Sequence, residues 1–501
     1  MSRILALALA FAALAPTAAF AGDPRIASYP DPVLAVQLSS LAREGAGGKS
    51  VPGVAVYDLD AKAWLFEHEA DRAFNPASVT KVVTTSTALK QLGSGFTFKT
   101  HLYTTGRIVD GVLQGDLVVK GEGDPSLTVE RLWRIASLVR VAGVHEIAGN
   151  LLVDDTYFDT VRTGIGYEDF DEERAYTAPL GATSATWNTV NVVVRPGSRL
   201  GAAADVVLDP PTGFVKLVSR AITGTPGSRR RIKATIENRV VTVSGSIPLG
   251  GEEKDYYRPI DDPPAYFGTL LSEYLAEDGI LIHGKIATAP APAGATLLFD
   301  YESEPLGVIV RDLNKYSNNF TAEQILKALG AEKYGAPGST EKGLAAEQEF
   351  LGSIGIDPKS SVIQNGSGLT RDTKLSPRLF VKALTADYDD FQVRGDFVAS
   401  LGIAGEDGTM RHRMLGTSAQ GALRAKTGTV DDSSCIAGYA RAPNGHTLAF
   451  AFLVNGTAGR TRRAIALQDR LGAVLTSWNG GATAAKPTPP PTLLANPESP
   501  H

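Results

Sequence analysis

The sequence predicts an α/β (α+β) protein whose main domain is interrupted by a large, strand-rich insertion. Residues 76–92 carry an apolar helical pattern, and helical patterns resume after residue 317. Between them, from about 95 to 290, short β-like runs such as GDLVVKG and RVVTVSGSI are separated by Gly, Pro and Asp turns. Near the C-terminus, two strand-like runs joined at Pro-Asn-Gly predict a hairpin.

The length of the chain supports the same division, because 501 residues exceed what one ordinary hydrophobic core organises. The Ala/Pro-rich stretch at 288–296 predicts the seam where the chain returns to the main domain. The predicted organisation is a signal peptide at 1–21, a first part of the main domain at 22–94, the insertion at 95–294, a second part at 295–480, and a disordered, Pro-rich tail at 481–501.

The N-terminus has the pattern of a secretory signal. Arg3 precedes an apolar run at 4–14, and Ala19-Phe20-Ala21 supplies a small-x-small cleavage site before Gly22. The run is too short for a permanent membrane anchor, and no later segment reaches about 18 uninterrupted apolar residues. An exported protein without a transmembrane anchor is expected.

Composition argues against several classes of function. A net charge of −5 disfavours a nucleic-acid partner. The single cysteine, Cys435, cannot form a disulfide within the chain and is expected to be a buried thiol. The seven histidines lack the paired spacing of metal ligands, so no metal site is predicted.

The first chemical motif is Ser78-Val79-Thr80-Lys81 at the head of the helical pattern. Residues three apart share a helix face, so Lys81 can reach the Ser78 hydroxyl. A desolvated lysine there can serve as a base for a serine nucleophile. The alternative is ordinary helix capping by serine. Ser339-Thr340-Glu341-Lys342 has the same spacing in a polar, Gly-flanked context, so the motif alone decides nothing.

Two further motifs follow in a fixed order. Lys426-Thr427-Gly428 lies on a predicted strand, where the lysine and threonine can bind a substrate carboxylate and the glycine can let a substrate backbone approach. Ser317-x-Asn319 lies between the other two and can supply a proton relay and an amide for a substrate carbonyl. A second Ser-x-Asn, at 477–479, follows the Lys-Thr-Gly and therefore fails on order.

These three motifs resemble those of the penicillin-interacting serine acyltransferases. The gap between Ser78 and Ser317 is 239 residues (317 minus 78), too long for typical β-lactamases. It is similar to that of the class C low-molecular-mass penicillin-binding proteins, the D-alanyl-D-alanine carboxypeptidase/endopeptidases. Further matches at 115–128, 147–158, 365–377 and 403–414 extend the resemblance over nearly the whole chain except the tail.

The resemblance implies a transpeptidase/β-lactamase-like domain, its sheet flanked by helices, with an insertion of two nested subdomains. It implies that Ser78 is the nucleophile and Lys81 its base, with Ser317 and Asn319 in the proton relay and substrate cradle. The strand residues Lys426, Thr427 and Gly428 would bind the terminal carboxylate side of the substrate. The backbone N–H groups of Ser78 and Thr429 would form the oxyanion hole.

Two further assignments concern the side chain of a diaminopimelate-containing substrate. The resemblance implies an acid from the insertion, Asp171, with Tyr176 as an aromatic wall and Arg371 as the cation. The run YEDFDEERAY departs from the family pattern, so Asp169 is an alternative to Asp171, and either acid could equally belong to a solvated loop.

The expected function is that of a periplasmic serine D-Ala-D-Ala carboxypeptidase and DD-endopeptidase. It would act on peptidoglycan stem peptides through a Ser78 acyl-enzyme and be acylated by β-lactams, with no cofactor or metal. The alternatives are a β-lactamase, which would differ in rapid loss of the adduct, and a catalytically inert wall-binding protein, which would be indifferent to loss of Ser78.

Overall fold

The computed structural model describes residues 29–170 and 174–480. The predicted signal peptide, the predicted tail and Asp171 lie outside the described residues. Within these ranges, no helix combines the length and the apolar character needed to cross a membrane.

A six-stranded antiparallel sheet joins the two ends of the chain in the main domain, with strand order β19-β20-β21-β22-β1-β2. Its strands are β1 (Val51–Asp58), β2 (Ala63–His68), β19 (Gly402–Ile403), β20 (Leu423–Val430), β21 (Ser433–Arg441) and β22 (Thr447–Asn455). The hairpin that the sequence predicts near the C-terminus is β21–β22. Strand β1 pairs with β22, Val54 opposite Phe452, so distant parts of the chain complete one sheet.

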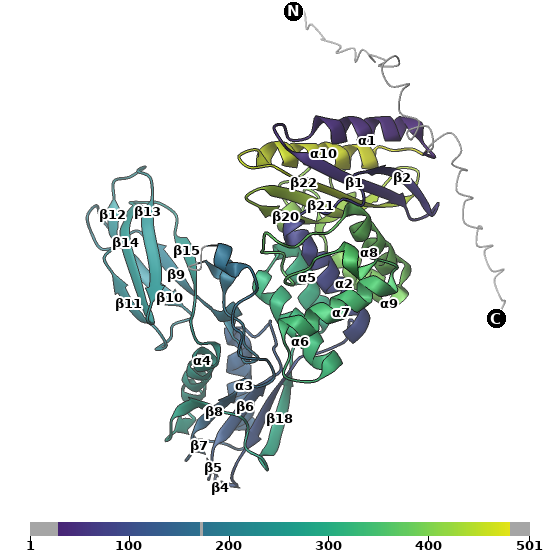
Figure 1. The fold of residues 1–501 in the computed structure, drawn as a ribbon. Coiled ribbons are helices and arrows are strands. Elements are labelled where there is room, and N and C mark those ends of the chain that lie inside the picture. The colour runs from purple at the N-terminus through teal and green to yellow at the C-terminus, as the bar shows by residue number, and fades with distance from the viewer. Residues whose placement is uncertain (1–28, 171–173, 481–501) are drawn as a thin grey trace, which may run out of the picture.

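Helices cover both faces of this sheet. Alternate side chains of a strand point to opposite faces, and in β1 and β22 the side chains on both faces are buried. Val54 and Val56 share a core with α1 (Pro32–Glu44) and α10 (Thr461–Thr476), whereas Ala55 packs into the core of a second helical layer. That layer comprises α2 (Lys81–Leu92), α5 (Leu306–Tyr316), α6 (Asn319–Tyr334), α7 (Thr340–Ser353), α8 (Pro377–Asp389) and α9 (Phe391–Ser400). Figure 1 shows the two layers on opposite sides of the sheet. The predicted fold class is confirmed.

The strand-rich insertion leaves the main domain after α2 and returns before α5. One part contains a five-stranded sheet, β17-β8-β6-β3-β18, a four-stranded sheet, β16-β7-β5-β4, and two helices. Nested within it are a three-stranded sheet, β10-β9-β15, and a four-stranded sheet of β11 to β14, which Figure 1 shows as a separate lobe. Buried side chains of both parts form one continuous hydrophobic cluster.

The elements of the insertion are β3 (Lys99–Thr104), β4 (Ile108–Val109), β5 (Val112–Leu113), β6 (Leu117–Gly121), α3 (Val129–Val141), β7 (Glu146–Ile147), β8 (Leu151–Asp154), β9 (Thr189–Arg195), β10 (Asp205–Asp209), β11 (Lys216–Ser219), β12 (Ile222–Gly224), β13 (Arg231–Glu237), β14 (Val240–Pro248), β15 (Lys254–Pro259), α4 (Pro263–Glu277), β16 (Leu281–Ile282), β17 (Ile286–Thr288) and β18 (Thr296–Glu302). Strand β18 pairs with β3. We therefore propose that the chain re-enters the main domain after β18, several residues beyond the predicted boundary at 294.

Short 3-10 turns connect several of these elements: η2 (Ala77–Thr80), η3 (Tyr167–Asp169), η4 (Ala175–Thr177), η5 (Thr186–Asn188), η6 (Pro358–Ser360) and η7 (Gly408–Met410). Four of them, η2, η3, η4 and η7, contribute residues to the site described below. Cys435 on β21 is buried, as predicted, and burial raises the pKa of its thiol to about 12.

Candidate active site

Ser78 and Lys81 meet at the start of α2. The predicted helix over 76–92 divides into the 3-10 turn η2, which carries Ser78, and the α-helix proper, which begins at Lys81. The Lys81 Nζ lies 3.1 Å from the Ser78 Oγ. Neither turn nor helix has a side-chain capping hydrogen bond, so the capping interpretation of Ser78 finds no support in the contacts.

Lys81 is completely buried and surrounded by acceptors. Its ammonium donates to Asn319 Oδ1 at 2.7 Å and to the carbonyl oxygen of Ser367 at 2.6 Å. Burial lowers the pKa of Lys81 to about 7, because a charged amine loses its hydration there, although the nearby carboxylate of Glu323 opposes the shift. A substantial neutral fraction beside a serine hydroxyl can take the proton of that hydroxyl.

Ser317 and Lys426 form a second pair in the same site. Lys426 Nζ donates to Ser317 Oγ at 2.8 Å and to the carbonyl of Thr427 at 2.7 Å. Ser317 sits between α5 and α6 with a φ of +60°, a conformation that few non-glycine residues adopt. Burial lowers the pKa of Lys426 well below its usual value, and the charge of Lys81 acts in the same direction.

Strand β20 borders the site with an edge that is partly open. Its neighbour β19 pairs only with Arg424 and Ala425, so no strand formed by the described residues covers the edge from Lys426 onward. Thr427 donates its hydroxyl to Thr409 Oγ1 at 2.8 Å, and Thr429 is exposed. An extended substrate backbone can therefore lie along this edge.

Gly428 is where β20 touches the turn that carries Ser78. A Cβ on Gly428 would lie 2.5 Å from the carbonyl oxygen of Pro76 and 2.8 Å from the backbone nitrogens of Ser78 and Val79. From the sequence, we expect this glycine to let a substrate backbone approach. In the structure, it also lets β20 approach the backbone of the Ser78 turn. Only a glycine lets the strand pack this closely on the turn.

Glu323 is a buried member of the site that the sequence motifs missed. Its carboxylate accepts the N–H of Gly366 at 3.1 Å and that of Ser367 at 2.8 Å, and the carbonyl of the same Ser367 accepts from Lys81. Burial raises the pKa of Glu323, and the hydrogen bonds to the 366–367 segment lower it. Its position one helical turn after Asn319 on α6 was a usable signal, since residues four apart share a face.

The insertion contributes a segment that closes one side of the site. The carbonyl of Tyr176 in η4 accepts from Asn319 Nδ2 at 3.1 Å, and Tyr167 Oη lies 3.3 Å from Ser367 Oγ. Thus it is the backbone of Tyr176 that is tied to a motif residue, while its side chain is exposed. Tyr167 is fully buried and was not predicted.

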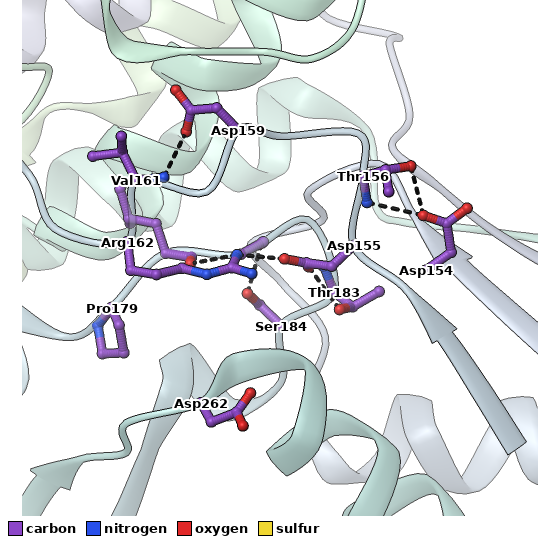
Figure 2. Close-up of polar contacts among 12 residues, drawn as sticks. Asp154, Asp155, Thr156, Asp159, Val161, Arg162, Pro179, Thr183, Ser184 and Asp262 are labelled. Carbon is purple, nitrogen blue, oxygen red and sulfur yellow. Dashed lines mark hydrogen bonds and ion pairs between the residues drawn. The ribbon is translucent and has the colours of Figure 1, made fainter. Parts of the chain in front are cut away.

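Two ion pairs, each with one buried partner, lie at the base of this segment. Asp155 pairs with Arg162 and accepts from the backbone N–H and hydroxyl of Thr183, at 2.6 and 2.7 Å, as Figure 2 shows. Lys327 on α6 donates to Asp159 at 2.6 Å. The contacts of Asp155 lie within the insertion, whereas the pair of Lys327 and Asp159 ties the segment to α6 of the main domain.

Arg371 lines a pocket of about 320 Å³ next to the end of β20. Phe170 of the insertion and Val430 and Asp431 lie in the same lining, and Arg371 Nη2 is 3.5 Å from Asp431 Oδ2. Asp169, the alternative acid, is exposed on η3. The position of Asp171 is not among those described, so its role stays a prediction.

The competing motif copies have structural roles. Ser339 caps α7, its Oγ accepting from the N–H of Lys342 at 3.2 Å, while the Lys342 side chain donates to the carbonyls of Gly335 and Pro337. Ser477, the second Ser-x-Asn serine, contacts Ser418 at 2.9 Å at the end of α10.

One group of metal-ligand type occurs among the described residues: Asp58, Asp60 and His446. Asp58 accepts two backbone N–H groups with one oxygen and contacts His446 Nδ1 at 2.7 Å with the other. Asp60 accepts the N–H of Thr447 at 2.6 Å. These contacts hold two strand ends together, and they engage carboxylate oxygens of both aspartates in hydrogen bonds within the protein.

Comparison with known proteins places the chain in a family. Residues 34–473 match the D-Ala-D-Ala carboxypeptidase 3 (S13) family. A D-alanyl-D-alanine carboxypeptidase of Actinomadura sp. is 33% identical over 93% of this chain and 87% of its own. A D-alanyl-D-alanine carboxypeptidase of Haemophilus influenzae is 24% identical over 86% of this chain and 92% of its own.

Solved structures share the fold. Penicillin binding protein 4 of Haemophilus influenzae has a TM-score of 0.75 at 23% identity, covering 87% of this chain and 99% of its own. A predatory endopeptidase of Bdellovibrio bacteriovorus has a TM-score of 0.53 at 18% identity, covering 87% and 94%. The resemblance to low-molecular-mass penicillin-binding proteins is confirmed. The chain belongs to the D-Ala-D-Ala carboxypeptidase 3 (S13) family and is a serine-type D-Ala-D-Ala carboxypeptidase.

Proposed function

We propose that Ser78 is the nucleophile that attacks the penultimate D-Ala carbonyl of a peptidoglycan stem peptide, with Lys81 as the base. The observation that carries this proposal is the buried Lys81 amine, 3.1 Å from the Ser78 hydroxyl, with a pKa near 7. As the new C–O bond forms, Lys81 takes the hydroxyl proton. It returns the proton to the departing D-Ala nitrogen when the C–N bond breaks, and water then hydrolyses the acyl-enzyme.

The remaining motif residues bind and polarise the substrate. The backbone N–H groups of Ser78 and Thr429 would hold the oxyanion, since Gly428 brings β20 against the Ser78 turn. Lys426 and Thr427 would bind the terminal carboxylate, whose charge favours the protonated form of Lys426. Ser317, already 2.8 Å from Lys426, would pass protons between the two lysines, and Asn319 would hold a substrate carbonyl.

The pocket beside Arg371 would take the side chain of the residue before D-Ala. A diaminopimelate side chain ends in an amine and a carboxylate, which suit an acid and an arginine. Arg371 and Phe170 line this pocket, and Phe170 directly precedes Asp171. We assign Arg371 to the carboxylate and Asp171 or Asp169 to the amine. Tyr176, which is not among the residues that line this pocket, would supply an aromatic wall from the insertion.

The same site would cleave D-Ala–diaminopimelate cross-links and be acylated by β-lactams. A solved relative, penicillin binding protein 4 of Haemophilus influenzae, has been obtained in complex with a β-lactam. The test incubates the purified protein with D-Ala-D-Ala pentapeptide, with cross-linked muropeptide dimers and with benzylpenicillin. We expect D-Ala release, dimer cleavage and a persistent penicilloyl mass on the peptide containing Ser78.

Three results would contradict this assignment. An adduct mapped to another residue would exclude Ser78 as the nucleophile. An adduct lost within seconds would favour a β-lactamase. No D-Ala release and no dimer cleavage would favour an inert wall-binding protein.

We further propose that the protein works in the periplasm after removal of residues 1–21. The support is the charged, apolar and small-residue order of the N-terminus. N-terminal sequencing of the protein recovered from a periplasmic fraction should begin near Gly22. Recovery of uncleaved protein in the cytoplasm would contradict this localisation.

The acylation rate should rise with pH through about 7. Only neutral Lys81 can accept the Ser78 proton, and its pKa is lowered to about 7, so the neutral amine predominates above that pH. The carboxylate of Glu323 favours the charged form of Lys81 and so opposes the lowering of its pKa. Lys426 is a second amine in the same site, and its own pKa is lowered well below its usual value. We expect kcat/KM for a β-lactam to rise about tenfold per pH unit below this pKa and then level off, as stopped-flow measurements across the range would record. A rate that falls as pH rises through 7 would exclude Lys81 as the base.

Glu323→Gln should slow acylation and move its pH midpoint downward. Glutamine has one acceptor oxygen for two N–H groups, so the 366–367 segment would lose a charge-assisted hydrogen bond of about 1.5–3 kcal/mol. Loss of the negative charge would also lower the pKa of Lys81 further. We expect acylation to slow about 10- to 100-fold, with the pH profile measured by stopped flow.

Glu347→Gln is the matched control. Glu347 is equally buried on α7. Burial, with the nearby carboxylate of Glu323 acting in the same direction, raises the pKa of its carboxyl to about 8, so it is already neutral at pH 7. It should leave the pH midpoint of acylation in place. An equal shift in both variants would assign the effect of Glu323 to general packing.

A further inference from the structure

A cleft of about 1030 Å³ lies where the insertion meets the main domain. Its lining comes from α5 and the start of α6 on one side, and from α3, β9 and β15 of the insertion on the other. None of the motif residues lines it, so the proposed reaction leaves this cleft without a role.

Three aromatic side chains from separate elements are exposed in this cleft. Trp187 in η5 is 41% exposed, Tyr257 on β15 is 49% exposed, and Tyr316 at the end of α5 is 72% exposed. Large aromatic residues are usually buried or used at binding surfaces. Their convergence from distant parts of the chain indicates a binding wall.

The backbone of Trp187 is held in an unfavourable conformation. Thr186, Trp187 and Asn188 have consecutive φ values of +48°, +55° and +51°. Each non-glycine residue in this region costs of order 1–3 kcal/mol, and such residues concentrate at functional sites. Asn188 is fully buried and donates to the carbonyl of Pro179 at 2.8 Å, which fixes the turn while leaving the indole in the cleft.

Polar groups complete the lining. Arg131 pairs with Glu304 at 3.3 Å, and Arg311 lies beside Asp312 at 3.4 Å. A surface that combines flat aromatic rings with arginines and carboxylates suits a sugar. The C–H faces of a pyranose stack on such rings, and its hydroxyl and acetamido groups form hydrogen bonds with both charge types.

The cleft adjoins the catalytic site through two chain neighbours. Asn318 lines the cleft and lies between Ser317 and Asn319. Ala175 also lines it and precedes Tyr176, whose carbonyl accepts from Asn319 Nδ2. A stem peptide held by Asn319 therefore has the cleft directly beyond that residue.

We propose that this cleft binds the amino-sugar units that carry the stem peptide, with Trp187, Tyr257 and Tyr316 as stacking surfaces. The proposal rests on the proposed action on peptidoglycan stem peptides. It predicts that the protein prefers a peptide still attached to its sugars over the same peptide alone.

Trp187→Ala tests this with two substrates, free pentapeptide and disaccharide-pentapeptide. We expect kcat/KM for the sugar-bearing substrate to fall about 3- to 10-fold, a loss of the size found for one aromatic pair, and kcat/KM for the free peptide to stay constant. Trp187→Phe, which keeps a ring, should restore most of the loss. Tyr316→Ala should also lower kcat/KM for the sugar-bearing substrate relative to kcat/KM for the free peptide, and it leaves the strained turn at Trp187 unchanged.

Trp133→Ala is the control, because Trp133 is an exposed tryptophan on α3 that does not line the cleft. It should leave both substrates unaffected. An equal fall for both substrates with Trp187→Ala, or no fall for the sugar-bearing one, would overturn the proposal.

A binding measurement separates this proposal from the proposed reaction. Ser78→Ala cannot form the acyl-enzyme, so titration of that variant with the disaccharide-pentapeptide gives an affinity that turnover does not affect. Adding Trp187→Ala should weaken that affinity about 3- to 10-fold. An unchanged affinity would overturn the sugar site even if the reaction proceeds at Ser78.

Discussion

Lys81→Met is expected to lower the rate constant for acylation by a β-lactam about 10²–10⁴-fold, the contribution typical of a general base. Methionine is unbranched and of similar length, so it can occupy the buried space without the amine. The amine has contacts to Ser78, Asn319 and Ser367 at 3.1, 2.7 and 2.6 Å, so the substitution removes the proposed base and leaves two acceptors without their donor. Stopped-flow acylation and thermal unfolding would measure the two consequences separately.

Lys342→Met is the matched control for this variant. Lys342 has the same spacing from a serine, but its amine binds the carbonyls of Gly335 and Pro337 at the start of α7. The acylation rate of Lys342→Met should equal that of the unmodified protein. If Lys81→Met retained more than about a tenth of the acylation rate, another group would have to be the base.

The contrast between Lys81 and Lys342 shows how much of the candidate site can be predicted from the sequence. Both lie three residues after a serine, and both serines are at helix starts. Ser339 caps its helix, whereas Ser78 makes no capping hydrogen bond and faces the buried amine of Lys81. The order of the three motifs points to the copy at 78–81, and in the structure Lys81 contacts Asn319 of a second motif, 238 positions away.

What the sequence could not supply are the contacts made by backbone and by the insertion. Ser367 binds Lys81 through its carbonyl, which every residue has, so no residue type marks it. Tyr167 reaches Ser367 only because the insertion folds back over the main domain. The start of the α2 helix could not be predicted for a similar reason. The apolar pattern of the sequence continues through residues 77–80 as a helix, but these residues form a 3-10 turn against which β20 packs closely.

Gly428→Ala is expected to reduce acylation at least about 10²-fold and to destabilise the fold. The added Cβ would meet three backbone atoms of the Ser78 turn at 2.5–2.8 Å, and backbone atoms cannot move aside as a flexible side chain can. Overpacking of this kind costs about 1–3 kcal/mol. The strand and the turn must separate, which moves Ser78 relative to Thr429, and a displacement of about 1 Å in a reacting group can cost about 10²-fold in rate.

Gly395→Ala distinguishes this local effect from a general effect of replacing glycine. Gly395 lies within α9 and a Cβ there meets nothing within 4 Å, so alanine should stabilise the helix by about 0.5–1 kcal/mol and leave acylation unchanged. The free energy of unfolding and the acylation rate are both measured at a temperature where each variant is fully folded. If Gly428→Ala lost stability but acylated normally, the strand would not set the position of Ser78. Loss of both ties the Lys-Thr-Gly glycine to the geometry of the Ser78 turn as well as to substrate access.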